Sequence, residues 1–254
     1  MRVLFVGDVF GEPGLRAVGL HLPDLRPQYD LVIVNGENAH HGKGLSKAAY
    51  RKLRDAGADL ITLGNHAFDH KDVYELLQGE PVIRAHNYPP GTPGKGHWVL
   101  EARGERLLVA QVMGQVNMGL NLYDPFRTSE ALLAEVAHDY ALLEVHAEAT
   151  SEKYALGYYL DGRIDALLGT HTHVQTADAG FLANGTAIQS DVGMTGPIHS
   201  IIGGEIESFL GRFLTQRPTP FKAASGRAML CATELVLEGG RCTAIRPMRW
   251  EESQ

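Results

Sequence analysis

Short apolar runs, each ending at a polar residue, recur along this chain and constrain its fold more than any other feature. Six of these runs are "RVLFVGD", "LVIVNGEN", "LITLGNH", "ALLEVH", "DALLGTHTH" and "AIQSD". Continuous apolar stretches of about four to eight residues are typical of strands buried on both faces, as in parallel sheets. The runs therefore predict an α/β protein built around buried strands.

Helix-like and hairpin-like stretches separate these runs. Residues 46–56 begin with a serine cap and contain "AAYRKLRDA", and residues 129–138 read "SEALLAEVAH", so both predict helices. Two other stretches, "HWVLEARGERLLVAQV" and "AMLCATELVLEGGRCTAIRPMRW", predict β-hairpins with turns around Gly104 and at Gly239 and Gly240. We therefore expect a mixed sheet, or two packed sheets with helices outside.

One domain is expected over residues 1–254, because no linker, internal repeat or low-complexity tract divides the chain. A hydrophobic content of 44% supports a sizeable core. Residues 197–226 have little strand pattern and surround the amphipathic stretch "IESFLGRFL". Three interpretations of this segment stay open: a lid, a surface excursion, or a subunit contact that would make the protein a homo-oligomer.

Charge and composition exclude several classes of function. The net charge of −7 argues against non-specific binding of nucleic acid, which needs a basic surface. No leader-like segment follows Met1 and no run of about 18 apolar residues occurs, so we expect a soluble, cytoplasmic protein without a membrane span. Cys231 and Cys242 have no metal-ligand spacing and are predicted to be core or strand residues.

Polar side chains with metal-binding chemistry follow the predicted strands. In open α/β sheets, ligands bind beyond the carboxyl ends of the strands. The candidates at these ends are Asp8, Glu37, Asn38, Asn65, His66, His146, His171 and His173, with Asp191 behind them. Carboxylate, amide and imidazole donors without thiolate suit iron, manganese or zinc, and their number suits two ions better than one.

Each candidate also has an ordinary structural interpretation. Asp8, Asn65 and Asp191 are of types common in turns and caps after strands, and His146 lies in an apolar strand as a buried histidine would. The pair His-x-His at 171 and 173 is also found in solvated turns. In an extended segment, however, side chains two apart leave one face about 6.6 Å apart, which would let the two rings converge on one point or on two neighbouring points, as metal ligands do. Coincidence at several strand ends is the weaker explanation.

The ordered motifs "GDVF", "NGEN", "GNH", the isolated His146 and "GTHTH" resemble those of the calcineurin-like metallophosphoesterases. Within that superfamily, "GDVFG", "NGENA" and "HAEATSEK" are similar to the bacterial YmdB-like branch, described as 2',3'-cyclic-nucleotide phosphodiesterases. The resemblance implies a four-layer α-β-β-α sandwich of two mixed sheets flanked by helices. It also implies two transition-metal ions, with iron as the first choice and manganese or zinc as alternatives.

The resemblance further implies a role for each motif residue. Asp8 would bind the first metal together with His173, and Glu37 would bridge both metals. The second metal would be held by Asn65, His146 and His171. His66 would be the proton donor.

Three positions depart from the wider superfamily. Phe10 stands where a metal-binding histidine is usual, and Asn38 is the natural substitute through its amide oxygen. Glu37 stands where an aspartate usually bridges. Ala67 stands where an acid usually follows the GNH histidine, so that Asp69, another carboxylate or no residue at all would orient His66.

The chemistry expected from this set is hydrolysis of a small phosphodiester or nucleotide by a metal-bound hydroxide, with His66 protonating the leaving oxygen. A phosphomonoesterase or nucleotidase on the same metal core is the first alternative. A metal-binding regulatory module that contacts RNA or a protein is the second. His40, His41 and His199 are weaker candidates for contact with the substrate.

Overall fold

The protein folds into two β-sheets that pack face to face, and the computed structural model describes residues 1–220 and 222–253. The first sheet has the order β11-β12-β1-β2-β3-β4, with β13 paired to β12. Its strands are β1 (Arg2–Val6), β2 (Leu31–Asn35), β3 (Leu60–Thr62), β4 (Val82–Ile83), β11 (Gly196–Pro197), β12 (Ala228–Glu238) and β13 (Arg241–Glu251). Strands β1 to β4 are parallel, whereas β12 is antiparallel to β1.

The second sheet has the order β5-β6-β7-β8-β10-β9. Its strands are β5 (His97–Ala102), β6 (Glu105–Met113), β7 (Tyr140–His146), β8 (Ala166–Thr170), β9 (Gly180–Phe181) and β10 (Ala187–Gln189). The four central strands are parallel, and β5 and β9 are antiparallel to their neighbours. Both sheets are therefore mixed, as predicted.

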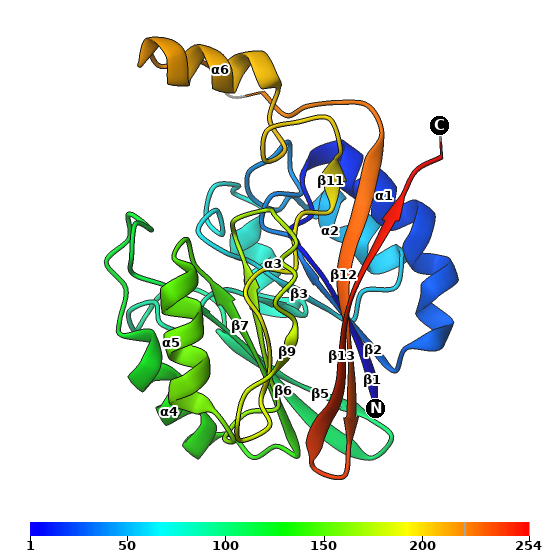
Figure 1. Cartoon of the computed structure of the whole chain (residues 1–254), viewed down its shortest axis with the longest axis vertical. Coiled ribbons are helices and arrows are strands. Elements are labelled where there is room, and N and C mark those ends of the chain that lie inside the picture. Colours follow the sequence, from blue (N-terminus) through cyan, green and yellow to red (C-terminus); the bar gives the residue numbers. More distant parts are fainter. Residues whose placement is uncertain (221, 254) are drawn as a thin grey trace.

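Helices cover the outer face of each sheet (Figure 1). They are α1 (Gly11–Leu25), α2 (Lys47–Asp55), α3 (Val73–Gly79), α4 (Pro125–Glu135) and α5 (Thr150–Leu160). The chain also contains the 3-10 helix η1 (Arg26–Gln28) and the exposed helix α6 (Ile206–Thr215). One apolar cluster joins α1, α2 and α3 to the first sheet, and another joins α4 and α5 to the second. The predicted four-layer α-β-β-α sandwich is confirmed.

The layer between the sheets is a continuous apolar core. Phe5, Ile33 and Leu60 of the first sheet pack with Val109 and Leu142 of the second, and each is at most 2% exposed. Burial of one such side chain stabilises the fold by about 1.5–3 kcal/mol. Because both sheets are fixed by this core, the polar residues that follow their strands are held on a rigid base.

Most predicted elements are present. All six apolar runs contain a strand, and both predicted hairpins form, β5–β6 and β12–β13, with turns at the expected glycines. The side chain of Ser46 caps α2 by accepting a hydrogen bond from the Ala49 amide at 3.2 Å. The sequence analysis did not predict α1, α3 or α5.

The predicted helix over residues 129–138 was wrong at both ends. Helix α4 begins at Pro125, where Asp124 accepts a hydrogen bond from the Phe126 amide at 2.8 Å, and Val136 is already extended. An aspartate before a proline is itself a start signal, because proline at the first helical position needs no amide partner.

Segment 197–226 contains β11 and α6, and α6 stands out from the sandwich on the side toward which β1 runs (Figure 1). None of the described residues of α6 is buried. Cys231 and Cys242 are buried in β12 and β13, as predicted for core residues. Within the described residues, no helix combines the length and apolar character needed to cross a membrane.

Candidate metal centre

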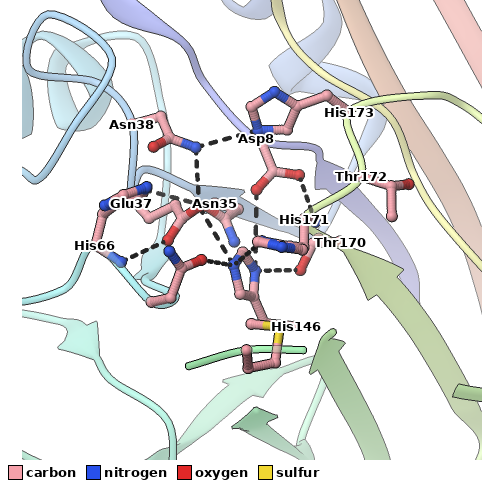
Figure 2. A network of polar contacts seen from close by, with 12 residues as sticks. Asp8, Asn35, Glu37, Asn38, His66, His146, Thr170, His171, Thr172 and His173 are labelled. Carbon is pink, nitrogen blue, oxygen red and sulfur yellow. Dashed lines mark hydrogen bonds and ion pairs between the residues drawn. The ribbon is translucent and has the colours of Figure 1, made fainter. Parts of the chain in front are cut away.

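The strand ends of both sheets meet at one point, and the structure brings all seven predicted ligand residues to it (Figure 2). The first sheet contributes residues after β1, β2 and β3, and the second sheet contributes the end of β7 and the loop after β8. The cluster consists of Asp8, Glu37, Asn38, Asn65, His146, His171 and His173. This convergence is what parallel strands with aligned carboxyl ends produce.

Two groups within the cluster have the spacing of metal sites. Ligand atoms of Glu37, His146 and His171 lie within 4.8 Å of one another, and so do those of Asp8, Glu37 and His173. Glu37 is common to both groups. This sharing is the arrangement that a carboxylate bridging two ions requires.

The ring of His146 is at the centre of the second group. Its Nε2 atom is 2.9 Å from Asn65 Oδ1, 3.1 Å from His171 Nδ1 and 3.3 Å from Glu37 Oε1. One ring nitrogen carries at most one proton and cannot satisfy three neighbours. The geometry is suited to a cation that all four atoms surround.

Asp8 gives a second indication of a cation. Its side chain is 0% exposed, and Oδ1 has no hydrogen-bond partner among the described residues. Its other oxygen accepts a hydrogen bond from the His171 amide at 3.2 Å. A buried carboxylate oxygen without a donor is costly unless a cation compensates it.

Asn38 points into the cluster, as its predicted role requires. Its amide nitrogen donates to Glu37 Oε1 at 2.8 Å and is 3.2 Å from His173 Nε2. Rotating the amide by about 180° exchanges nitrogen for oxygen at this position, and the two atoms are assigned from the hydrogen-bond network. The ring of Phe10 packs edge-on against His173, with centroids 5.6 Å apart.

The backbone of the two loop histidines differs from the extended form that was expected. Strand β8 ends at Thr170, and φ is +97° at His171 and +67° at His173. The prediction that both rings leave one face of a strand was therefore wrong. Left-handed backbone at non-glycine residues costs about 1–3 kcal/mol each and is found mainly at functional sites.

Buried polar contacts hold this loop in its strained form. Asp191 Oδ2 accepts hydrogen bonds from the Thr172 amide at 3.0 Å and the Thr172 hydroxyl at 2.8 Å. Lys153, which is 1% exposed, donates to Asp191 Oδ2 at 3.0 Å and to the Thr170 carbonyl at 2.8 Å. Asp191 thus supports the loop rather than joining either group of candidate ligands.

The two loop histidines face the cluster through opposite ring nitrogens. His171 Nε2 is 3.2 Å from Glu148 Oε2, so its Nδ1 faces His146. His173 Nδ1 donates to the Ile202 carbonyl at 2.9 Å, so its Nε2 faces Asn38. A hydrogen bond on one ring nitrogen fixes the tautomer and leaves the other nitrogen as a ligand.

A buried relay fixes the ring of His146 in the same way. The Thr170 hydroxyl donates its single proton to Glu144 Oε1 at 2.8 Å, so it can only accept from His146 Nδ1 at 2.9 Å. Asn35 donates to the same Glu144 oxygen at 2.6 Å. Sequence reasoning missed these supporting roles, although a glutamate inside the apolar run "ALLEVH" was a usable signal.

Burial and charge perturb the titration of the cluster. Burial raises the pKa of Asp8 to about 7. Burial alone would lower the pKa of His146, but the Glu37 carboxylate and its hydrogen bond outweigh it and raise this pKa to about 9. Burial, reinforced by the charge of His146, lowers the pKa of His171 to about 3, which keeps that ring neutral as a ligand must be.

His66 lies beside the cluster without belonging to either group of candidate ligands. Its Nδ1 is 2.7 Å from Asp69 Oδ2, and its amide donates to Glu37 Oε2 at 3.1 Å. Asp69 is therefore the carboxylate that orients this ring, one of the alternatives left open by the sequence. Nearby, a Cβ atom on Gly64 would lie 2.3 Å from Glu37 Oε2 and 2.4 Å from the His146 ring, so only glycine fits there.

A cavity of about 310 Å³ opens over the cluster. It is lined by Phe10, Glu37, Asn38, Gly42, Lys43, His66, Glu148, His171, Thr172, His173, Ile202 and Phe209. His40 and His41 line a separate hollow with His70, and His199 is exposed outside the described lining. A larger hollow of about 600 Å³ between α1 and α2 contains no member of the cluster.

The fold of the chain is similar to that of a calcineurin-like phosphoesterase. It superposes on a crystal structure of the calcineurin-like phosphoesterase YfkN from Bacillus subtilis with a TM-score of 0.53, covering 100% of this chain and 90% of that one. Sequence identity is 12%, so this similarity concerns the fold alone.

The chain belongs to the YmdB-like protein family, whose sequence profile matches residues 4–248. A 2',3'-cyclic-nucleotide 2'-phosphodiesterase from Bacillus subtilis is 44% identical over 251 residues, which cover 97% of this chain and 95% of that protein. The crystal structure of a hypothetical protein from Thermus thermophilus is 66% identical, with a TM-score of 0.98 and 100% of both chains covered. The resemblance stated from the motifs is confirmed.

Proposed function

We propose that this protein is a metal-dependent phosphodiesterase that hydrolyses 2',3'-cyclic nucleotides. The observation that carries the proposal is the pair of candidate ligand groups that share Glu37, with the Asp69-oriented His66 beside them. The choice of substrate is supported by the Bacillus subtilis relative, which is named for this activity and is 44% identical over 97% of this chain.

Two transition-metal ions fit the donors of the cluster. Asp8, Asn38 and His173 would hold the first ion, with Glu37 between the two. The second ion would be held by Asn65, His146 and His171. Oxygen and nitrogen donors without thiolate suit iron, manganese or zinc, and iron is the first choice only because the family resemblance implies it. Such a pair, when bound, activates water near neutral pH and neutralises the charge of the phosphoryl group.

The protein's own residues would manage the leaving group. As the water oxygen bonds to phosphorus, the bond from phosphorus to O2' breaks, and the product is a 3'-phosphate. His66 would give the departing O2' a proton from Nε2, because its Nδ1 is turned to Asp69 at 2.7 Å. The water releases one proton in this step, and His66 is then reprotonated from solvent.

Metal analysis combined with a hydrolysis screen tests the proposal. Wild-type protein reconstituted with iron or manganese should hold about two ions per chain and should turn over 2',3'-cyclic nucleotides faster than linear diesters or monoesters. Glu37→Gln keeps the shape and removes the bridging charge, so both ions should weaken together. Glu12→Gln is the control, since the Glu12 side chain is 62% exposed on α1.

Each other outcome of this screen favours an alternative. One ion or none would contradict the dinuclear centre. Preference for monoesters would favour a nucleotidase. Two bound ions without turnover of any phosphate ester would favour the regulatory module.

The role of Asn38 has its own test. Asn38→Ala should lower occupancy of the first ion while the second, held by Asn65, His146 and His171, stays bound. Equal loss of both ions would show that Asn38 supports Glu37, to which it donates at 2.8 Å, rather than binding metal.

A further inference from the structure

The cavity over the cluster has two unlike walls. One part of the lining is polar and carries His66 and four of the candidate ligands, Glu37, Asn38, His171 and His173. Another part, the apolar wall, carries large side chains from segment 197–226, namely Ile202 and Phe209. A phosphate group binds through polar contacts and gains nothing from apolar side chains. The apolar wall therefore indicates a ligand that also has an apolar part.

Ile202 is held there at a conformational cost. It lies in a tight turn in which the Ile201 amide donates to the Gly204 carbonyl at 3.0 Å and the Gly204 amide donates to the Ile201 carbonyl at 2.9 Å. The φ angle of Ile202 in this turn is +44°. A β-branched residue rarely adopts left-handed backbone, where asparagine or glycine would be favoured. Its side chain is 48% exposed, so core packing does not account for the isoleucine.

The turn contacts both a candidate ligand and Phe10. The Ile202 carbonyl accepts a hydrogen bond from His173 Nδ1 at 2.9 Å. A Cβ atom on Gly203 would lie 2.7 Å from the Phe10 ring, so the turn packs directly on Phe10. The backbone at Ile202 is therefore held next to His173 and Phe10.

Phe209 brings α6 to the same wall. It lines the cavity, whereas Phe213, one turn further along α6 and 68% exposed, is absent from the described lining. Helix α6 buries none of its described residues, so Phe209 is only half-buried beside the cavity.

We propose that Ile202 and Phe209 form the surface on which the nucleobase of the substrate rests, an inference that builds on the proposed function. In a 2',3'-cyclic nucleotide the phosphate is fused to the ribose, and the base projects away from it. With the phosphate at the cluster, the base needs an apolar surface within the same cavity. Stacking on an apolar or aromatic wall accepts every base, because each base has a flat π-face.

Kinetics on cyclic phosphates with and without a base test the role of this apolar wall. Phe209→Ala and Ile202→Asn should raise KM for 2',3'-cyclic AMP, GMP, CMP and UMP by about 5- to 150-fold, the range that loss of one stacking contact produces. For glycerol 1,2-cyclic phosphate, which has no base, KM should change less than twofold. Phe213→Ala is the control on the same helix and should leave both substrates unchanged.

Thermal unfolding separates contact with the base from a structural role. Asparagine tolerates left-handed backbone, so Ile202→Asn should keep or raise Tm while KM for the nucleotides rises. A lowered Tm with equal losses on both substrates would make Ile202 structural and overturn the proposal, and so would unchanged kinetics in both variants.

Binding decides the matter if the proposed hydrolysis fails. Calorimetry with adenosine 3'-phosphate and with glycerol phosphate reports on the wall without turnover. Weaker binding of the nucleotide alone in Phe209→Ala and Ile202→Asn would support the wall even in a protein that hydrolyses neither cyclic phosphate. Equal binding by wild type and both variants would overturn it.

Discussion

The metal centre and segment 197–226 face the same cavity but are built in opposite ways. Asp8 and His146 are 0% exposed and are fixed by both sheets. In α6, Phe213 and Leu214 are 68% and 80% exposed, and no described residue is buried. Groups that must hold their geometry during chemistry thus sit on the core, whereas the proposed contact with the base includes α6, which buries none of its described residues.

The two regions are joined by a hydrogen bond from His173 Nδ1 to the Ile202 carbonyl at 2.9 Å. Mutations in the two regions should therefore have different effects on the substrates. Changes in the cluster should affect every substrate equally, and changes in the segment should affect only substrates that carry a base.

The largest effect is expected at His66. His66→Gln should lower kcat by about 10²- to 10⁴-fold, the usual contribution of a positioned general acid, while metal content and KM stay near wild type. The loss should be the same for a cyclic nucleotide and for glycerol 1,2-cyclic phosphate, since both release an alkoxide.

A nitrophenyl diester serves as the control for His66, because its leaving group needs little protonation. The loss of kcat should be smaller on this compound. Equal losses on good and poor leaving groups would make His66 a charge-stabilising group, and loss of metal would make it a ligand.

Gly64→Ala should come next, because a single methyl group would collide with two candidate ligands. The new Cβ would lie 2.3 Å from Glu37 Oε2 and 2.4 Å from the His146 ring. Overpacking of this kind costs about 1–3 kcal/mol of unfolding free energy, and displacement of both ligands should weaken both ions. Metal content and chemical unfolding measure the two effects.

Gly19→Ala provides the matched control for Gly64. A Cβ atom at Gly19 meets nothing within 4 Å, and the residue lies inside α1, so alanine should leave the metal content unchanged and stabilise the protein by up to about 1 kcal/mol. If Gly64→Ala retained both ions, Glu37 and His146 could move aside for the new methyl group, and the cluster would be less rigid than its burial indicates.

Glu148 tests a smaller contribution to the same centre. Its carboxylate lies 3.2 Å from His171 Nε2 and directs Nδ1 toward the cluster. Glu148→Ala should weaken the second ion by about 10- to 100-fold, the range found for partners that orient a metal-binding histidine. Glu148→Gln keeps an acceptor oxygen and should restore most of the affinity. Failure of glutamine to restore binding would point to the charge rather than the tautomer.

The sequence predicted the buried strands and the positions of the candidate ligands because both follow from local pattern, whereas the four-layer arrangement came from the family resemblance. Buried parallel strands appear as continuous apolar runs, and a residue directly after such a run is placed by the strand before it. Glu37 and Asn65 were found in this way. The start of α4 was missed although its signal, Asp124 before Pro125, is local too.

The hydrogen bonds that support the candidate ligands were not predicted, because they join residues that are distant in the sequence. Lys153 and Asp191 are 38 positions apart, and His173 and Ile202 are 29 positions apart. The left-handed backbone at His171 also has no sequence signal, since histidine is not a residue that requires it. Loop conformation here is set by the buried polar contacts and not by the residues that adopt it.

The smallest expected effect is a pH dependence of stability in the metal-free protein. The pKa of His146 is raised to about 9, so the folded state holds a proton that the unfolded state releases above about pH 6.5. This stabilisation is complete below pH 6.5 and is lost as pH rises through 9. Asp8, with its pKa raised to about 7, acts in the same direction between about pH 4 and 7. His171, with its pKa lowered to about 3, opposes it there, because its contribution is lost as pH falls from about 6.5.

Asp8 is half-titrated at pH 7 and largely deprotonated by pH 8, so among these three groups the interval from pH 8 to 9 isolates His146. Urea unfolding with chelator present should show the free energy of unfolding falling by up to about 1 kcal/mol per pH unit across it. His146→Gln should flatten the slope, whereas Ile202→Asn, on the other wall of the cavity, should leave it unchanged. Saturating manganese should reverse the slope in the wild type, since ligands bind metal in their deprotonated forms. If the slope persists in His146→Gln, the pH dependence belongs to groups outside the cluster. The raised pKa that the neighbours of His146 predict would then be wrong.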